Sequence, residues 1–171
     1  MVCPIYNYAE ITVRRAELSE VDDIKKIIKE AYAPVKKQLS RTPGALDEGL
    51  AKISRHIQMG NQYIALLGTH IVGTMRVSLS GNAGVVSRLA VRTEYRKRRI
   101  GTVLIEYAEN LLTHMNALMI EVELYGVLEG QTEFYSKHGY VETDRQKRSG
   151  EVIVTMQKSL EEQPVVEDED L

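Results

Sequence analysis

The chain has 171 residues, of which 43% are hydrophobic and 27% are charged, and its formal net charge is −2. This length and composition predict one soluble globular domain, and the nearly neutral charge argues against a general nucleic-acid-binding protein. No apolar run reaches the length of a membrane span, and we expect no signal peptide. The single cysteine, Cys3, permits no internal disulfide, which favours the reducing cytoplasm.

Hydrophobic periodicity divides the chain into predicted helices and strands. Ser19 precedes an apolar repeat of helical spacing, so we expect it to cap a helix that ends near Pro34. Two later helices are expected to end at Gly60 and Gly139, where glycine tolerates a left-handed turn. The predicted helices are residues 21–34, 46–59, 99–112 and 129–138, and the predicted strands are residues 11–14, 63–67, 71–77, 85–91, 117–124, 140–142 and 151–156.

This order of elements predicts an α/β domain over residues 10–158. Its first half favours a mostly antiparallel sheet, and a β-α-β crossover is expected in the middle of the chain. Residues 1–9 are expected to form a lead-in. Residues 159–171 are acidic and contain proline, so we expect a disordered tail there.

A basic turn between a strand and a helix is the most informative segment. A helix N-terminus presents unpaired N–H groups and the positive end of its dipole, so it attracts phosphate. Arg96, Lys97, Arg98 and Arg99 add four positive charges at this point. A basic cluster standing alone is more often a solvated helix end. The strand before it and the amphipathic helix after it favour a diphosphate site.

The same segment resembles motif A of the GNAT superfamily, the Gcn5-related N-acetyltransferases, whose pattern is Arg/Gln-x-x-Gly-x-Gly/Ala. Arg96 matches the first position and Gly101 the last, while Arg99 replaces the usual middle glycine. Residues 133–140 (EFYSKHGY) resemble motif B of that family. The resemblance implies the GNAT fold, a central mixed, mostly antiparallel sheet of six to seven strands flanked by about four helices.

Acetyl-CoA is the cosubstrate that the resemblance implies. Its diphosphate is expected on main-chain N–H groups of the basic turn, and its pantetheine arm is expected to pair with strand backbone. The strand part of this site also fits an ordinary buried strand, and both interpretations hold together because the ligand uses the main chain. No metal site is expected, because the four histidines lack ligand spacing. The expected cofactor-binding residues are Leu89, Ala90, Val91, Arg96, Lys97, Arg98, Arg99, Ile100, Gly101 and Thr102.

Two catalytic residues follow from the resemblance. Tyr135 matches the family tyrosine near the acetyl-CoA sulfur, which would protonate the leaving thiolate; a packed helix tyrosine is the alternative. Ser87 stands where many members place a glutamate base. Glu121 and Glu123 share one face of the next strand, where burial would make either a better base, although both also fit solvent-facing carboxylates. We choose Glu123, whose spacing to Tyr135 is similar to that in ribosomal-protein-type N-terminal acetyltransferases.

The expected function is an N-acetyltransferase in which a primary amine attacks the thioester directly, through a tetrahedral intermediate. The alternative is a non-catalytic acyl-CoA-binding regulatory module, favoured by Ser87, Arg99 and Leu128 at positions where the family has glutamate, glycine and asparagine. Nucleic-acid binding by the basic turn is a weaker third hypothesis. The acceptor stays open between a small-molecule amine and a protein N-terminus or lysine. Residues 33–50 and 145–150 would line the acceptor site, and they carry charges of both signs. No membrane partner is expected. Homodimers are common in the family.

Overall fold

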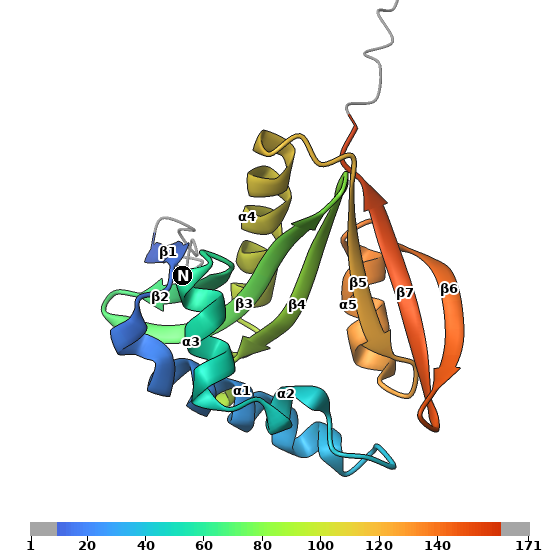
Figure 1. Cartoon of the computed structure of the whole chain (residues 1–171), viewed down its shortest axis with the longest axis horizontal. Coiled ribbons are helices and arrows are strands. Elements are labelled where there is room, and N and C mark those ends of the chain that lie inside the picture. Colours follow the sequence, from blue (N-terminus) through green and yellow to red (C-terminus); the bar gives the residue numbers. More distant parts are fainter. Residues whose placement is uncertain (1–9, 162–171) are drawn as a thin grey trace, which may run out of the picture.

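A computed structural model describes residues 10–161 of the chain and shows a seven-stranded sheet with helices on both faces (Figure 1). The strand order is β1-β2-β3-β4-β5-β7-β6. The helices are α1 (Val21–Lys36), α2 (Gly44–Asp47), α3 (Leu50–Gln58), α4 (Ile100–His114) and α5 (Glu129–Lys137). The strands are β1 (Ile11–Arg15), β2 (Gln62–Leu67), β3 (His70–Ser80), β4 (Ala83–Val91), β5 (Met119–Tyr125), β6 (Val141–Arg148) and β7 (Glu151–Ser159).

The expected mixed, mostly antiparallel sheet is confirmed. Strands β1 to β4 are antiparallel neighbours, and the crossover through α4 makes β5 parallel to β4. Each face of the sheet has its own apolar cluster: α4 packs on one face, and α1 and α3 pack on the other. Ile24, Ile28 and Ile53 are fully buried on the α1–α3 face, as the helical spacing of α1 and α3 predicts.

The pairing of β4 with β5 is short. In the described chain, β4 pairs with β5 over residues 83–85, whereas β5 pairs with β7 along its whole length. Beyond that point the two strands diverge, and Figure 1 shows the gap widening from the top of the sheet downward. This divergence leaves an open wedge, bounded on one side by residues 86–91 of β4.

Three expectations about the helices at the start of the chain are wrong. Helix α1 continues through Pro34, where a proline in the last turn removes little of the hydrogen-bond ladder. The N-cap of α1 is Glu20, which makes no side-chain capping bond, so Ser19 does not cap the helix. The helix expected over residues 46–59 is two helices, because Glu48 is extended and turns its side chain into the protein, and Gly49 then caps α3.

The expected lead-in over residues 1–9, with Cys3, lies outside the described residues, as does most of the expected tail. Strand β7 itself runs to Ser159, and the Leu160 N–H donates to the Leu118 carbonyl at 2.9 Å. Among the described helices, none has both the length and the apolar character that crossing a bilayer requires.

Close packing of α4 on β4 predicts a cost for any side chain at Gly84. A Cβ there would lie 2.4 Å from Cδ1 of Leu112, which is fully buried on α4. We expect Gly84→Ala to destabilise the protein by about 1–3 kcal/mol in urea unfolding, because the helix must shift. Gly130→Ala is the control, since a Cβ there meets nothing within 4 Å. Equal stability of Gly84→Ala and the wild type would contradict this packing.

Candidate active site

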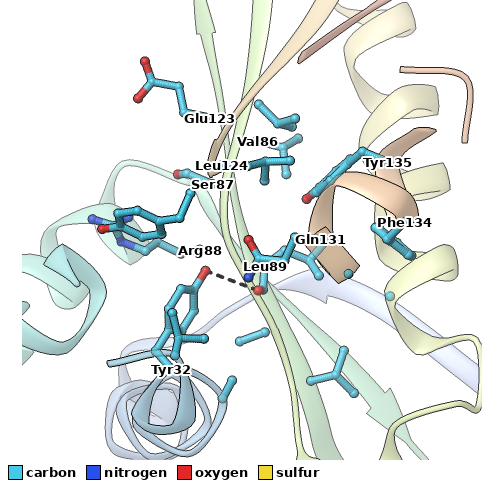
Figure 2. Close-up of a pocket in the computed structure, with 18 of the residues that line it drawn as sticks. Tyr32, Val86, Ser87, Arg88, Leu89, Glu123, Leu124, Gln131, Phe134 and Tyr135 are labelled. Atoms are coloured by element: carbon cyan, nitrogen blue, oxygen red, sulfur yellow. Dashed lines mark hydrogen bonds between the residues drawn. The ribbon is translucent and has the colours of Figure 1, made fainter. Parts of the chain in front are cut away.

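A cavity of about 1120 Å³ occupies the wedge between β4 and β5. Its lining comes from α1 and the segment after it, β4, the basic turn and the start of α4, β5, α5 and the β6–β7 hairpin. Figure 2 shows that Tyr32 lies on one side of β4 and Tyr135 on the other. The cavity therefore passes between the strands and joins the two faces of the sheet.

The turn before α4 bends sharply at two basic residues. Lys97 and Arg99 have φ values of 60° and 63°, the left-handed conformation that side chains with a Cβ seldom adopt. Arg99 is thus accommodated where a glycine is usual. The bend brings the first residues of α4, Ile100, Gly101 and Thr102, to the cavity wall.

The first turn of α4 is suited to a diphosphate. The main-chain N–H groups of Ile100, Gly101 and Thr102 donate to no acceptor within residues 10–161. Such N–H groups and the helix dipole attract an anion, and Arg96 and Lys97 line the same end of the cavity. The residues present therefore fit the diphosphate of coenzyme A.

Nine of the ten expected cofactor-binding residues line the cavity, and Arg98 does not. Its guanidinium instead lies over the ring of Tyr95, 5.4 Å from the centroid. The nine are Leu89, Ala90, Val91, Arg96, Lys97, Arg99, Ile100, Gly101 and Thr102.

His138 is half-buried and contacts Thr102, which lines the cavity at the start of α4. Its Nδ1 lies 2.8 Å from the Phe134 carbonyl, and its Nε2 lies 3.2 Å from the Thr102 hydroxyl. Because the carbonyl can only accept, Nδ1 carries the proton and donates. Thr102 is 36 residues away in the chain, so no local pattern could have revealed this pair.

Tyr135 is buried, with 6% of its surface exposed, and it lines the wedge. Its ring packs edge-on against Phe134 and Tyr140, with centroids 5.1 Å and 5.3 Å away. The hydroxyl faces the gap between the strands (Figure 2) and makes no hydrogen bond to any described residue. Burial, followed by the nearby Tyr32, raises the pKa of Tyr135 above its usual value, so the phenol stays protonated at neutral pH.

Beyond the residues that pair with β5, β4 carries a bulge. Thr74 pairs with Ala90 and Arg76 pairs with Ser87, so two residues of β4, Arg88 and Leu89, face one residue of β3. Arg88 has φ 54°, again left-handed. The Tyr32 hydroxyl donates to the Leu89 carbonyl at 3.4 Å, the contact drawn as a dashed line in Figure 2.

The two glutamates of β5 line the cavity, and Glu123 fits the solvent-facing alternative. Its side chain is 49% exposed and accepts hydrogen bonds from Arg148 at 3.2 Å and 3.3 Å. Glu121 is half-buried and accepts from the Gln157 amide at 2.8 Å. Period-two alternation placed both on one face correctly, with Val122 and Leu124 buried on the other.

A buried ionic cluster lies beneath the cavity, and the sequence patterns did not predict it. Glu48 accepts from both terminal nitrogens of Arg76 at 3.0 Å and 2.9 Å and from Nε of Arg88 at 3.0 Å. Glu48 and Arg76 are 4% and 6% exposed. Burial would raise the pKa of Glu48, but hydrogen bonds and charges of the two arginines outweigh it and lower that pKa to about 2. The helix break at Gly49 was the available local signal.

The two segments expected to wall the acceptor touch each other. Both the N–H and the hydroxyl of Ser40, after α1, donate to Oε1 of Glu151 in the β6–β7 hairpin, at 2.5 Å and 2.6 Å. Arg41, Thr42 and Ser149 line the cavity beside this contact. The contact bridges the end of the cavity that lies away from α4.

Comparison with known proteins agrees with this architecture. The PaiA N-acetyltransferase of Thermoplasma acidophilum, solved in complex with coenzyme A, has a TM-score of 0.76 at 16% identity, over 87% of this chain and 98% of that one. The ribosomal-protein-S18-alanine N-acetyltransferase of Escherichia coli has a TM-score of 0.71 at 11% identity, over 88% and 94%. The GCN5-related N-acetyltransferase of Rhodopseudomonas palustris has a TM-score of 0.71 at 25% identity, over 86% and 94%.

A search of curated proteins gave no significant match. The family model of the acetyltransferase (GNAT) domain matches residues 59–142, from the end of α3 to the start of β6. This span contains the basic turn, the wedge and Tyr135. Residues 59–142 thus match the GNAT acetyltransferase domain, and the fold around them is that of the solved N-acetyltransferases described above.

Proposed function

We propose that the protein is an acetyl-CoA-dependent N-acetyltransferase, in which a primary amine attacks the thioester directly, through a tetrahedral intermediate. The observation that carries this proposal is a single cavity that joins the anion-binding start of α4 to the opposite face of the sheet, with the Tyr135 hydroxyl in between. Acetyl-CoA supplies the activated acyl group, and the protein supplies binding, orientation and proton transfer.

In this proposal the coenzyme is bound by main-chain groups that pair with no other described residue. The N–H groups at the start of α4 hold the diphosphate, and Arg96 and Lys97 add charge. Residues 86–91 of β4 border the wedge without pairing to β5, so the pantetheine amides add there like another strand. The thioester then lies near Tyr135.

Proton transfer on the acceptor side is assigned to Glu123. An alkylammonium has a pKa of about 10.4, so the amine must lose a proton before it attacks. Glu123 lies on the cavity wall at the exposed end and is held by Arg148. A carboxylate in that position accepts the proton through a water molecule. No cysteine is present in either motif, which disfavours an acyl-enzyme.

Coenzyme A binding tests the proposal directly. At a concentration of about 100 Kd, a ligand that binds the folded state stabilises it by about 2.7 kcal/mol, which for a domain of this size raises the melting temperature by about 5–10 °C. We expect Arg96→Gln to weaken coenzyme A binding by about 10- to 100-fold, the loss of one charge-assisted hydrogen bond.

Arg98→Gln is the matched control for Arg96→Gln. It removes the same charge from the same turn, but its side chain lies over Tyr95 and outside the cavity. We expect a smaller loss of affinity in this variant. Equal losses would mean that the turn acts by general charge. If coenzyme A binds and no amine releases thiol from acetyl-CoA, the protein is a non-catalytic acyl-CoA-binding module; absence of binding refutes both hypotheses.

A further inference from the structure

Arg88 occupies a distinctive place in the cavity. It lies on β4 next to Leu89, at the bulge, and its side chain extends to the α1–α2 face of the sheet, opposite Tyr135 (Figure 2). Under the proposed function, the coenzyme occupies the Tyr135 side. Arg88 therefore lies on the side from which the acceptor approaches.

The guanidinium of Arg88 makes its hydrogen bond to the protein through one of its three nitrogens. Its Nε donates to Oε1 of Glu48 at 3.0 Å, and a Cβ on Gly44 would lie 3.4 Å from Nη2, so α2 packs against the group. Neither Nη1 nor Nη2 of Arg88 donates a hydrogen bond to any residue in the described range 10–161. The side chain is 28% exposed and lines the cavity. The two terminal nitrogens of a fixed, planar group thus remain available there as donors.

The charges around Arg88 do not balance. Glu48 is the carboxylate that faces it, and Glu48 already accepts both terminal nitrogens of Arg76 and lies 3.4 Å from Lys52. One buried carboxylate therefore serves two guanidinium groups, and the excess positive charge is next to the cavity. A guanidinium that shares its carboxylate with a second arginine attracts a further anion, so this position favours an anionic ligand group.

The carboxylates at the acceptor end are already engaged. Glu123 is paired with Arg148, Glu151 accepts from Ser40, and Glu121 accepts from Gln157. Arg41 and Tyr32 line the same end and add a further positive charge and a hydroxyl. Each of these carboxylates thus has a partner in the protein, whereas the terminal nitrogens of Arg88 have none among residues 10–161, which suits an anion better than a second ammonium group.

We propose that Arg88 binds a carboxylate of the acceptor, so that the acceptor is a small amine carrying a carboxylate a few bonds from its nitrogen, such as a free amino acid. This inference rests on the proposed acetyl transfer. The terminal nitrogens of arginine match the two oxygens of a carboxylate in a bidentate fork. Because Arg88 adjoins Leu89, the bound carboxylate places the nitrogen of the same small molecule near the thioester.

Matched acceptor pairs test the proposal. Initial rates of thiol release are compared for L-alanine with L-alaninamide, and for β-alanine with β-alaninamide, so that each pair differs in the carboxylate. We expect kcat/KM to favour the acid of at least one pair by about 10- to 100-fold, the range for hydrogen bonds to a charged group. Arg88→Gln abolishes that preference through KM, and Arg88→Lys restores part of it because it keeps the charge without the fork.

Lys52→Gln is the matched control variant. It removes a positive charge from the same Glu48, but Lys52 is absent from the cavity wall. We expect it to keep the preference for the acid. Arg88→Gln should stay folded, since Glu48 keeps both hydrogen bonds from Arg76; its melting curve checks this.

The outcomes separate the two proposals. Equal rates for acid and amide, or acetylation restricted to peptide amines, overturn the carboxylate site and leave acetyl transfer intact. A preference that survives in Arg88→Gln also overturns it. Coenzyme A binding without acetylation of any member of either pair, or of a peptide amine, contradicts acetyl transfer itself, and the carboxylate site fails with it.

Discussion

Tyr135→Phe is expected to lower kcat by about 10²- to 10³-fold, the usual cost of removing one donor that acts on developing negative charge. The phenol is buried, its pKa is raised, and its hydroxyl faces the wedge without a protein partner. It therefore stays protonated, and under the proposed function it would donate to the sulfur as the thiolate leaves. Coenzyme A binding should change little, because the diphosphate site on α4 is untouched. Steady-state rates and calorimetric titration together measure both quantities.

Two neighbouring tyrosines provide the controls for Tyr135→Phe. Tyr140 packs edge-on against Tyr135, but its hydroxyl donates to Glu109 at 3.0 Å and it is absent from the cavity wall. Tyr140→Phe should lower stability and leave kcat nearly unchanged. Tyr32→Phe removes another phenol that lines the cavity, whose hydroxyl donates to the Leu89 carbonyl. A larger loss of kcat in Tyr32→Phe than in Tyr135→Phe would assign the proton donor to Tyr32 instead.

Local periodicity was sufficient to predict most of the sheet and the helices α4 and α5. Alternation along β5 separated Val122 and Leu124 from Glu121 and Glu123, because side-chain direction in a strand depends on the backbone alone. The solvent exposure of the two glutamates could not be predicted from alternation in the same way. Glu123 is open to solvent since the strands diverge there and its partner, Arg148, comes from a hairpin 25 residues later.

The features that sequence reasoning missed all depend on distant contacts. The cluster around Glu48 joins a helix break to β3 and β4, with partners 28 and 40 residues away. The contact of His138 with Thr102 depends on how α5 packs beside α4. Family motifs identify the residues proposed to bind the coenzyme, because such binding uses main-chain N–H groups near a glycine. They carry no information about a side chain, such as Arg88, whose role depends on a bulge.

Glu48→Gln is expected to destabilise the protein by about 3–5 kcal/mol, because it leaves Arg76 buried without a counter-charge. For a domain of this size that loss lowers the melting temperature by about 6–20 °C. The control is Glu142→Gln, which removes a carboxylate that also accepts two hydrogen bonds from an arginine, Arg145, on the exposed strand β6. Water can replace the hydrogen bonds of this exposed pair, so the stability of Glu142→Gln should stay close to that of the wild type.

The pH dependence of the stability lost in Glu48→Gln tests whether the Glu48 carboxylate is the source of that stability. The folded-state pKa is about 2 and the usual value is 4.5, so the stabilisation is complete above pH 4.5 and is lost as the pH falls towards 2. The difference in unfolding free energy between the wild type and Glu48→Gln should therefore shrink across that window, as urea titrations at pH 7, 4 and 3 would measure. A difference that stays constant with pH would mean that the pKa of Glu48 is the same in the folded and the unfolded protein, so the arginines would not stabilise its charged form.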